Sequence, residues 1–193
     1  MTTFIIRHGQ TDWNAEYRLQ GQQDIPLNEL GRRQATGNGL SLRRLADDLS
    51  AYQFVCSPLY RARETMERVR VAAGLDPGGY TIDQRLKEIS FGDWEGWTNA
   101  EIALTTPEKI EEREARKWDF VPPGEHAESY EILSWRVGSW LKELDRPTVA
   151  ICHGGVIRCI FKLTGTLDKS DAARLDIPQD KLLKYADGRL EWV

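Results

Sequence analysis

A histidine and a glycine end the first apolar run of this chain, Thr3-Phe4-Ile5-Ile6-Arg7-His8-Gly9. The same ending follows a second apolar run, Thr148-Val149-Ala150-Ile151-Cys152-His153-Gly154. Short continuous apolar runs rich in β-branched residues are typical of strands that helices cover on both faces of a parallel sheet. The ligand crevice of such a sheet lies beyond the carboxyl ends of its strands. We therefore expect His8 and His153 at one edge of one sheet, each followed by a glycine that permits a tight turn and the close approach of a ligand.

A third strand-like run, Phe54-Val55-Cys56-Ser57, leads into a helical pattern. Ser57 suits the N-cap of that helix, and Pro58 suits its first position. Arg61 then lies in the first turn, at the sheet edge that carries the two histidines. Because the helix dipole disfavours a cation at a helix N-terminus, an arginine there indicates that an anion binds beside it.

Three strand ends thus bring cationic side chains to one edge of the sheet, namely Arg7, Arg61 and His153. Each of these residues alone is more often an ordinary polar side chain, so the prediction of a site depends on their convergence. Guanidinium groups match phosphate oxygens in a fork geometry and keep their charge at physiological pH. Phosphate is therefore the predicted ligand.

Five blocks of the sequence, in the same order, resemble the histidine phosphatase superfamily, whose founding branch is the phosphoglycerate mutases. The blocks span most of the chain, and together they are far more specific than the Arg-His-Gly triplet alone. They are residues 7–14 (RHGQTDWN), 24–31 (DIPLNELG), 56–62 (CSPLYRA), 86–96 (LKEISFGDWEG) and 153–158 (HGGVIR).

The resemblance implies a role for each matching residue. His8 is then the nucleophile that becomes phosphorylated, and Glu88 is the proton donor. Four residues would hold the phosphoryl group, and two would lie nearer the rest of the substrate. The first set is Arg7, Asn14, Arg61 and His153, and the second is Gln20 and Gly21. No metal ion or other cofactor is implied.

The chemistry of phosphoryl transfer suits these residue types. A neutral imidazole is a good nucleophile, and water can hydrolyse a phosphorylated imidazole. Charge spreads over the equatorial oxygens in the transition state, where fixed cations stabilise it without a metal ion. Glu88 lies in a mainly apolar stretch with Ile89 and Phe91, where desolvation is expected to raise its pKa. From composition alone Glu88 is an ordinary surface carboxylate, so its role as the acid depends on the resemblance.

A different phosphatase motif also fits part of the sequence. Residues 152–158 match the Cys-x5-Arg loop of cysteine-dependent tyrosine phosphatases, in which a thiolate attacks phosphorus. The match is loose, because Ile151 stands where those enzymes carry histidine, and it leaves the N-terminal motif without a role. A buried structural thiol is the simpler interpretation of Cys152. No His-x-His or His-Glu-x-x-His pattern indicates a metal site.

Composition limits the partners and the compartment. The 193 residues carry 26 Lys and Arg against 30 Asp and Glu, a net charge of -4, which argues against nucleic acid or a lipid surface as a partner. Three unevenly spaced cysteines suggest reduced thiols in the cytoplasm. We expect no signal peptide, because the first strand begins close to Met1, and no apolar run reaches membrane-spanning length. The expected partner is a small phosphorylated metabolite, and a homodimer is left open.

Helical patterns alternate with short strands along the chain, which predicts an α/β fold. We expect a three-layer α/β/α sandwich around a mostly parallel central sheet. The length suits a single histidine-phosphatase-like domain over residues 1–193, with a lid-type insertion around residues 90–128. The charged tract at residues 108–117 indicates a solvated helix, with Glu112 and Arg116 at i,i+4 spacing.

The motifs favour a phosphatase that hydrolyses a small phosphomonoester through a phosphohistidine. Phosphoglycerate mutase-type phosphoryl transfer is one alternative, and it must exclude water while the product reorients. In the resembled family, members with that activity have a longer cover and tail, and a side-chain amide where this chain has Gly155. A ribazole-phosphate phosphatase is a specific possibility, and a catalytically silent protein that binds phosphorylated ligands is the alternative of a different class. Intact His8 and Glu88 argue against the silent protein, because a sensor needs neither nucleophile nor acid.

Overall fold

Six β-strands, eight α-helices and three short 3-10 helices make up the protein, of which the computed structural model describes residues 1–193. The strands are β1 (Thr2–Arg7), β2 (Gln53–Cys56), β3 (Thr81–Ile82), β4 (Thr148–Cys152), β5 (Leu182–Ala186) and β6 (Arg189–Trp192). The α-helices are α1 (Asp12–Ala15), α2 (Glu29–Leu45), α3 (Tyr60–Ala72), α4 (Asn99–Thr105), α5 (Pro107–Ala115), α6 (Tyr130–Lys142), α7 (Gly154–Leu163) and α8 (Lys169–Arg174). The 3-10 helices are η1 (Leu49–Ala51), η2 (Gln84–Leu86) and η3 (Gly92–Trp94).

The strands form one sheet in the order β3-β2-β4-β1-β5-β6. β1 is parallel to β4, β4 to β2 and β2 to β3, whereas β5 is antiparallel to both of its neighbours. The three runs that the sequence marks as strands are therefore adjacent at the centre of the sheet. Because these three strands are parallel, their carboxyl ends meet at one edge.

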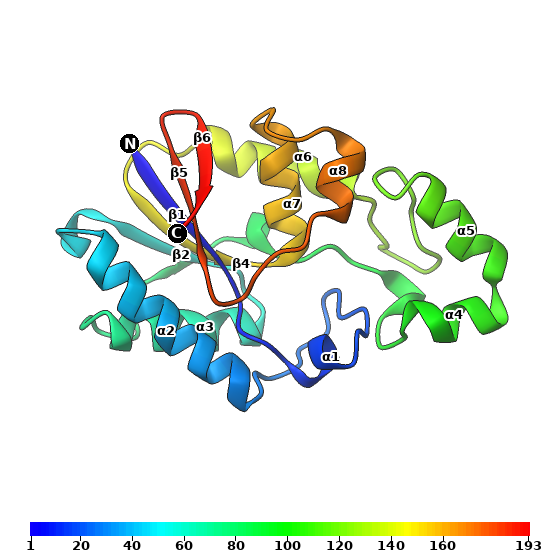
Figure 1. Ribbon diagram of the computed structural model, residues 1–193, viewed down its shortest axis with the longest axis horizontal. Helices are drawn as coiled ribbons and strands as arrows, with labels where there is room; N and C mark the ends of the chain where they lie inside the picture. The colour runs from blue at the N-terminus through cyan, green and yellow to red at the C-terminus, as the bar shows by residue number, and fades with distance from the viewer.

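Successive side chains of the central strands point to opposite faces of the sheet. Phe4 and Ile6 of β1 pack in one apolar cluster with Leu42 of α2 and Met66 of α3. Ile5, between them, packs instead with residues of α6 and α7. Figure 1 shows the result, in which α2 and α3 cover one face of the sheet while α6, α7 and α8 lie on the other. The predicted three-layer sandwich around a mostly parallel sheet is confirmed.

The chain from η3 to the end of α5 lies to one side of the sheet, where α4 and α5 form the green part of Figure 1. Its residues Trp94 and Ile102 form a small apolar cluster with Phe120, which follows α5. Two backbone hydrogen bonds attach it to the loop after α1. The N–H of Leu19 donates to the carbonyl of Trp97 (2.9 Å), and the N–H of Gly96 donates to the carbonyl of Leu19 (2.8 Å).

α5 corresponds to the charged helix predicted at residues 108–117. Glu112 and Arg116 form the expected ion pair. The prediction that this helix is solvated holds for every residue of α5 except Arg113, which is 5% exposed. None of the helices combines the length and apolar character needed to cross a membrane.

Candidate active site

The central strands place three of the predicted site residues side by side. The backbone N–H of His8, just past β1, donates to the last carbonyl of β4 (3.0 Å). The rings of His8 and His153 are consequently 5.1 Å apart, centroid to centroid. The N–H of Ser57, just past β2, donates to another carbonyl of β4 (3.0 Å), and α3 then carries Arg61 toward the two histidines. Both histidines and Arg61 are buried.

Backbone packing requires a glycine at position 9, directly after His8. A Cβ on Gly9 would lie 2.2 Å from the carbonyl oxygen of Gly31, in the first turn of α2. A Cβ on Gly31 would in turn lie 2.1 Å from the carbonyl oxygen of Gln10. The two segments touch backbone to backbone, which no residue with a Cβ permits. The close approach expected from the sequence is thus made by α2 at this position, and not by a ligand.

The hydrogen bonds of His8 define which ring nitrogen can react. Nδ1 lies 2.7 Å from the carbonyl oxygen of Gly9, which can only accept, so Nδ1 carries the ring proton. Nε2 keeps its lone pair and accepts a hydrogen bond from Nε of Arg61 (3.2 Å). Burial, together with the cations of Arg61 and Arg7, holds the pKa of His8 well below its ordinary value of 6.5. His8 is therefore a neutral imidazole at neutral pH, with an unprotonated Nε2 whose lone pair faces Arg61.

Arg61 reaches the site from the first turn of α3, as the sequence predicts, but the helix begins differently. Its N-cap is Leu59, and no side chain caps it. The predicted N-cap at Ser57, with Pro58 in the first position, is therefore wrong. The physical reason lies in the backbone, because the first carbonyl that accepts helical hydrogen bonds is that of Leu59, from the N–H groups of Ala62 (3.0 Å) and Arg63 (3.1 Å). The Ser57 hydroxyl lies 2.6 Å from Nε2 of His153.

The guanidinium of Arg61 is held on three sides. Nη1 donates to the carbonyl of Gln23 (2.6 Å), Nη2 donates to the carbonyl of Gly21 (2.8 Å), and Nε donates to His8. Burial lowers the pKa of Arg61 to about 10, so the group still carries its charge at neutral pH. Arg61 thus presents a fixed positive charge beside Nε2 of His8.

Arg7 approaches the same place from the end of β1. Its Nη1 donates to the carbonyl of Ile177 (2.6 Å), whereas its Nε is buried without a partner. Burial and the neighbouring cation of Arg158 lower the pKa of Arg7 to about 10. A buried donor without an acceptor costs free energy that a bound anion recovers. Arg7 is therefore prepared to bind an anion.

Asn14 is oriented by two donors to the same atom. Its Oδ1 accepts the N–H of Thr11 (3.2 Å), in the capping box of α1, and Nε2 of Gln179 (3.1 Å). Gln179 also donates to the carbonyl of His8 (3.0 Å). Since the side-chain oxygen of Asn14 is engaged, its amide nitrogen is the group left for a ligand.

Glu88 is half-buried, and its carboxylate lies beside the N-terminus of α7. Both carboxylate oxygens lie 3.1 Å from the backbone nitrogen of Gly155, and Oε1 also accepts the N–H of Ile89 (2.9 Å). The carbonyl of Glu88 accepts from the side chains of Arg136 (3.0 Å) and Gln22 (3.0 Å). The sequence predicts an apolar surrounding for this carboxyl group, but the structure surrounds it with backbone donors as well.

Gln20 and Gly21 lie in the loop after α1, and both line the cavity. Gly21 has a φ of +51°, and a Cβ there would lie 1.9 Å from Oε1 of Glu95. That oxygen accepts the N–H groups of Gln22 (2.9 Å) and Phe91 (3.1 Å). The Glu95 carboxylate therefore joins the loop that holds Arg61 to the segment that follows Glu88.

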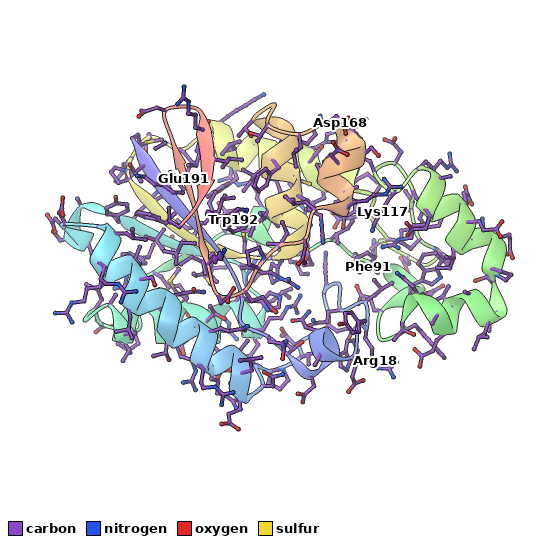
Figure 2. All side chains as sticks on the ribbon, in the orientation of Figure 1. Arg18, Phe91, Lys117, Asp168, Glu191 and Trp192 are labelled. Atoms are coloured by element: carbon purple, nitrogen blue, oxygen red, sulfur yellow. The ribbon has the colours of Figure 1, made fainter.

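One cavity of about 140 Å³ joins these residues. Of the eight predicted site residues, all but the fully buried His153 line it. Its charged lining is four arginines and one carboxylate, namely Arg7, Arg18, Arg61, Arg158 and Glu88. Arg18 and Phe91, labelled in Figure 2, lie on the side toward α4. The excess of positive charge concentrates anions in this cavity.

The cysteine alternative is contradicted by the surroundings of Cys152. The thiol is fully buried on the central strand β4, and burial together with the nearby Glu88 raises its pKa well above the ordinary value of 9.0. A thiol that stays protonated at neutral pH is a poor nucleophile. Arg158, the arginine of that motif, donates instead to the carbonyl of Leu175 (2.9 Å).

The arrangement can accept a phosphoryl group on nitrogen. It offers a neutral imidazole as the nucleophile and two guanidinium groups that stay charged. It also offers the carboxyl group of Glu88, beside the N-terminus of α7. No group of three or more His, Cys, Asp or Glu side chains is placed to hold a metal ion.

Three residues that shape the site escape the sequence patterns: Gln179, Glu95 and Arg158. Gln179 lies 171 positions from His8 in a loop without periodicity, so no local signal marks it. Glu95 and Arg158 lie inside the blocks at residues 86–96 and 153–158. The signal that could have identified these two residues is their place inside those blocks.

Comparison with known proteins agrees with this geometry. Residues 3–190 match the family described as the histidine phosphatase superfamily (branch 1). A glucosyl-3-phosphoglycerate phosphatase of Mycobacterium tuberculosis is 36% identical over 168 residues, which cover 81% of this chain and 71% of that protein. A probable phosphoglycerate mutase of Escherichia coli is 32% identical over 169 residues, which cover 83% of this chain and 73% of that protein.

The fold agrees as well. The solved structure of a mycobacterial glucosyl-3-phosphoglycerate phosphatase superposes with a TM-score of 0.78 at 29% identity, covering 95% of this chain and 88% of that one. The matched family spans nearly the whole chain, from the strand that precedes His8 to the last strand of the sheet. This chain belongs to the histidine phosphatase superfamily.

Proposed function

We propose that this chain hydrolyses a small phosphomonoester through a covalent phosphohistidine at His8. The observation that carries the proposal is the state of this imidazole, which is buried and neutral, with its Nε2 lone pair beside the Arg61 guanidinium. The cavity around it holds four arginines and one carboxylate, a setting for a doubly charged phosphoryl group. A named phosphatase at 36% identity supports the same activity.

In the first step, Nε2 of His8 attacks phosphorus, and the bond from phosphorus to the ester oxygen breaks. Arg7, Asn14, Arg61 and His153 hold the equatorial oxygens, on which charge accumulates in the transition state. The departing oxygen takes a proton from Glu88, the carboxyl group that lines the same cavity. The products of this step are the free alcohol and phosphohistidine.

In the second step, water attacks phosphorus, and the bond from phosphorus to Nε2 breaks. Glu88, now ionised, accepts a proton from the attacking water. Inorganic phosphate leaves, and His8 returns to its neutral form. No redox partner or further co-substrate is needed to balance the cycle.

The rest of the substrate is proposed to lie toward Gln20 and Gly21. A cavity of about 140 Å³ is smaller than the several hundred Å³ typical of pockets that enclose a drug-sized ligand, so it takes the phosphoryl group and little more. The segment at residues 90–128 then acts as a lid over the remainder, since Phe91 lines the cavity and Glu95 ties this segment to the loop that contains Gly21.

A substrate with a second acidic group is favoured by one observation. Arg158 lines the cavity, and its side chain donates to the carbonyl of Leu175 and to the hydroxyl of Tyr130 but to no carboxylate. A lining cation of this kind suits a carboxylate or a second phosphate on the substrate. Hydrolysis of esters that differ only in a carboxyl group, by the wild type and Arg158→Gln, tests this preference.

Mutase-type transfer and a ribazole-phosphate phosphatase stay as alternatives within the family, and a silent binding protein stays as the alternative outside it. The 32% identity to a probable mutase keeps the first open. Gly155 favours hydrolysis, because the amide expected at this position in mutases would meet Glu88, whose Oε1 lies 2.3 Å from a Cβ built there.

The deciding experiment combines phosphate release from a panel of phosphomonoesters with trapping of the intermediate. Quenching without acid during turnover should trap a phosphoenzyme that is stable to alkali and labile to acid. We expect His8→Ala to abolish both the adduct and the activity, and Cys152→Ser to retain most of each. An inactive serine variant beside an active alanine variant would replace this mechanism by the cysteine mechanism.

We also propose that the protein works in the cytoplasm. All three cysteines are free and buried, as expected in a reducing compartment. Cell fractionation tests the compartment, and sedimentation equilibrium decides between the monomer and the homodimer that the sequence leaves open.

A further inference from the structure

His153 is a buried imidazole with very different surroundings at its two nitrogens. Nε2 lies 2.6 Å from Oγ of Ser57, whereas Nδ1 is buried and has no partner in the protein. A neutral imidazole carries one proton, so one nitrogen donates and the other accepts. The partner at Nε2 therefore determines what His153 offers at Nδ1.

The hydrogen bonds of Ser57 decide the direction of the contact. Its Oγ already accepts the N–H of Leu59 (3.4 Å), and the residue is fully buried. If Oγ also accepted a proton from Nε2 of His153, the hydroxyl proton of Ser57 would have no acceptor, because the side chain makes no other hydrogen bond. A buried donor without an acceptor costs about 1–3 kcal/mol. When the hydroxyl donates to Nε2 instead, every group on Ser57 is satisfied.

We propose that Ser57 is a positioning residue that fixes His153 in the tautomer with its proton on Nδ1, so that a neutral imidazole donates a hydrogen bond to the phosphoryl group. The inference rests on the proposed function for the identity of the anion. The tautomer itself follows from the contacts of Ser57 alone.

The neutral tautomer matters because the charged form is disfavoured here. Burial, together with the cations of Arg61, Arg136 and Arg7 and the neighbouring His8, holds the pKa of His153 well below its ordinary value of 6.5. With the proton on Nε2, the ring would direct a lone pair at an anion from Nδ1. With the proton on Nδ1, the ring offers a donor and still needs no charge.

The first test reads the tautomer directly in the wild-type protein, and a variant serves only to assign the signals. The chain has three histidines, so ¹⁵N-histidine labelling gives three imidazole spin systems. His153→Gln removes the one that belongs to His153, and the side chain of His126 is 87% exposed, unlike the two buried histidines. We expect a protonated Nδ1 and an unprotonated Nε2 for His153. Protonation on Nε2 would overturn the proposal.

The second test removes the hydroxyl. We expect Ser57→Ala to lose the preference for Nδ1–H in the spectrum and to slow phosphorylation of His8 by about 10²-fold, near the lower end for loss of one transition-state donor. Ser57→Thr keeps a hydroxyl and should restore both the spectrum and most of the rate. Ser134→Ala, which removes another buried hydroxyl whose partner is a carbonyl of α6, should change neither.

The two readouts separate this inference from the proposed function. If Ser57→Ala were slow while His153 kept its proton on Nδ1, positioning through the tautomer would be wrong even though the enzyme is a phosphatase. If no phosphoenzyme formed in the wild type, the proposed function would fail while the tautomer could still be as described.

Discussion

Both carboxylate oxygens of Glu88 lie 3.1 Å from the backbone nitrogen of Gly155, in the first turn of α7. A helix N-terminus attracts a carboxylate through its free N–H groups and its dipole. The contact is possible only because residue 155 has no side chain, since a Cβ there would lie 2.3 Å from Oε1 of Glu88. The proposed acid is thus held by a backbone position, which the sequence marks only as the place where mutases of the resembled family carry a side-chain amide.

Substitution of Gly155 should therefore act through Glu88. We expect Gly155→Ala to displace the carboxyl group and to slow phosphorylation of His8 by at least tenfold, with a larger loss for Gly155→Asn. Pre-steady-state kinetics measure that step. Gly138 on α6 is a matched control, since a Cβ there has its nearest neighbour at 3.6 Å. Unchanged phosphorylation in Gly155→Asn would contradict the proposed placement of the acid.

A leaving-group comparison tests Glu88 as the acid. An alkyl phosphate releases a basic alkoxide, so Glu88→Gln should slow phosphorylation of His8 by about 10²–10⁴-fold, the range of general acid catalysis. A nitrophenyl ester releases a stabilised phenolate, so with this ester Glu88→Gln should slow phosphorylation of His8 much less. The amplitude and rate of the nitrophenolate burst separate this step from hydrolysis of the phosphoenzyme. Equal losses with both esters would show that Glu88 supports the site without acting as its acid.

Arg61 should not tolerate lysine. Its guanidinium donates at once to the carbonyls of Gly21 and Gln23 and to His8, which an ammonium group cannot reproduce. We expect Arg61→Lys to slow phosphorylation by about 10²-fold or more, as for loss of a fixed transition-state donor. Arg63→Lys, on the exposed face of the same helix, is the control and should stay near wild type. A fully active Arg61→Lys enzyme would remove Arg61 from the proposed set.

Gln179 should set the affinity for the phosphoryl group through Asn14. Gln179→Leu removes one of the two donors that hold Oδ1 of Asn14 and leaves only the N–H of Thr11, so the amide is less firmly oriented toward the ligand. A loss of about 1.4 kcal/mol, within the cost of an unmade buried hydrogen bond, corresponds to a tenfold weaker inhibition by vanadate. Gln53→Leu is the control. Gln53 begins β2, at the end of the strand away from the site, and its amide donates to Thr148. Equal inhibition constants for the wild type and Gln179→Leu would exclude this role.

The buried histidines make stability depend on pH. The folded protein holds the pKa of His8 and of His153 well below 6.5, so below pH 6.5 the unfolded chain binds more protons than the native state. The free energy of unfolding should then fall with decreasing pH, by about 1.4 kcal/mol per pH unit for each histidine until its folded pKa is reached. Above pH 7 this contribution should be constant.

Urea unfolding of the wild type and His153→Gln between pH 7.5 and 5 measures this effect. The difference between the two proteins should change by about 1.4 kcal/mol per pH unit below pH 6.5, while carboxylates common to both cancel. His126→Gln is the control, because the side chain of His126 is 87% exposed. Parallel curves for all three proteins would mean that His153 binds its proton equally well in the native state and in the unfolded chain, which contradicts the lowered pKa.

The sequence by itself determined the central strands and the residues at their ends. A continuous apolar run reports burial on both faces, and this local property is enough to identify β1, β2 and β4. Because parallel strands end at one edge, His8 and His153 had to meet there, with Arg61 on the helix that follows β2. The family blocks added Glu88, Asn14, Gln20 and Gly21, which periodicity could not have selected.

Only the tertiary structure decided how these residues are held. Ser57 lies 96 positions from His153, Gly155 lies 67 from Glu88, and Gln179 lies 171 from His8. Sequence patterns report the local periodicity of burial, whereas these contacts depend on which strands are neighbours and where the loops return. The start of α3 shows the consequence. Ser57 has the chemistry of an N-cap, but α3 begins after Leu59, and the buried hydroxyl of Ser57 also contacts His153, a partner that only the packed structure places within reach.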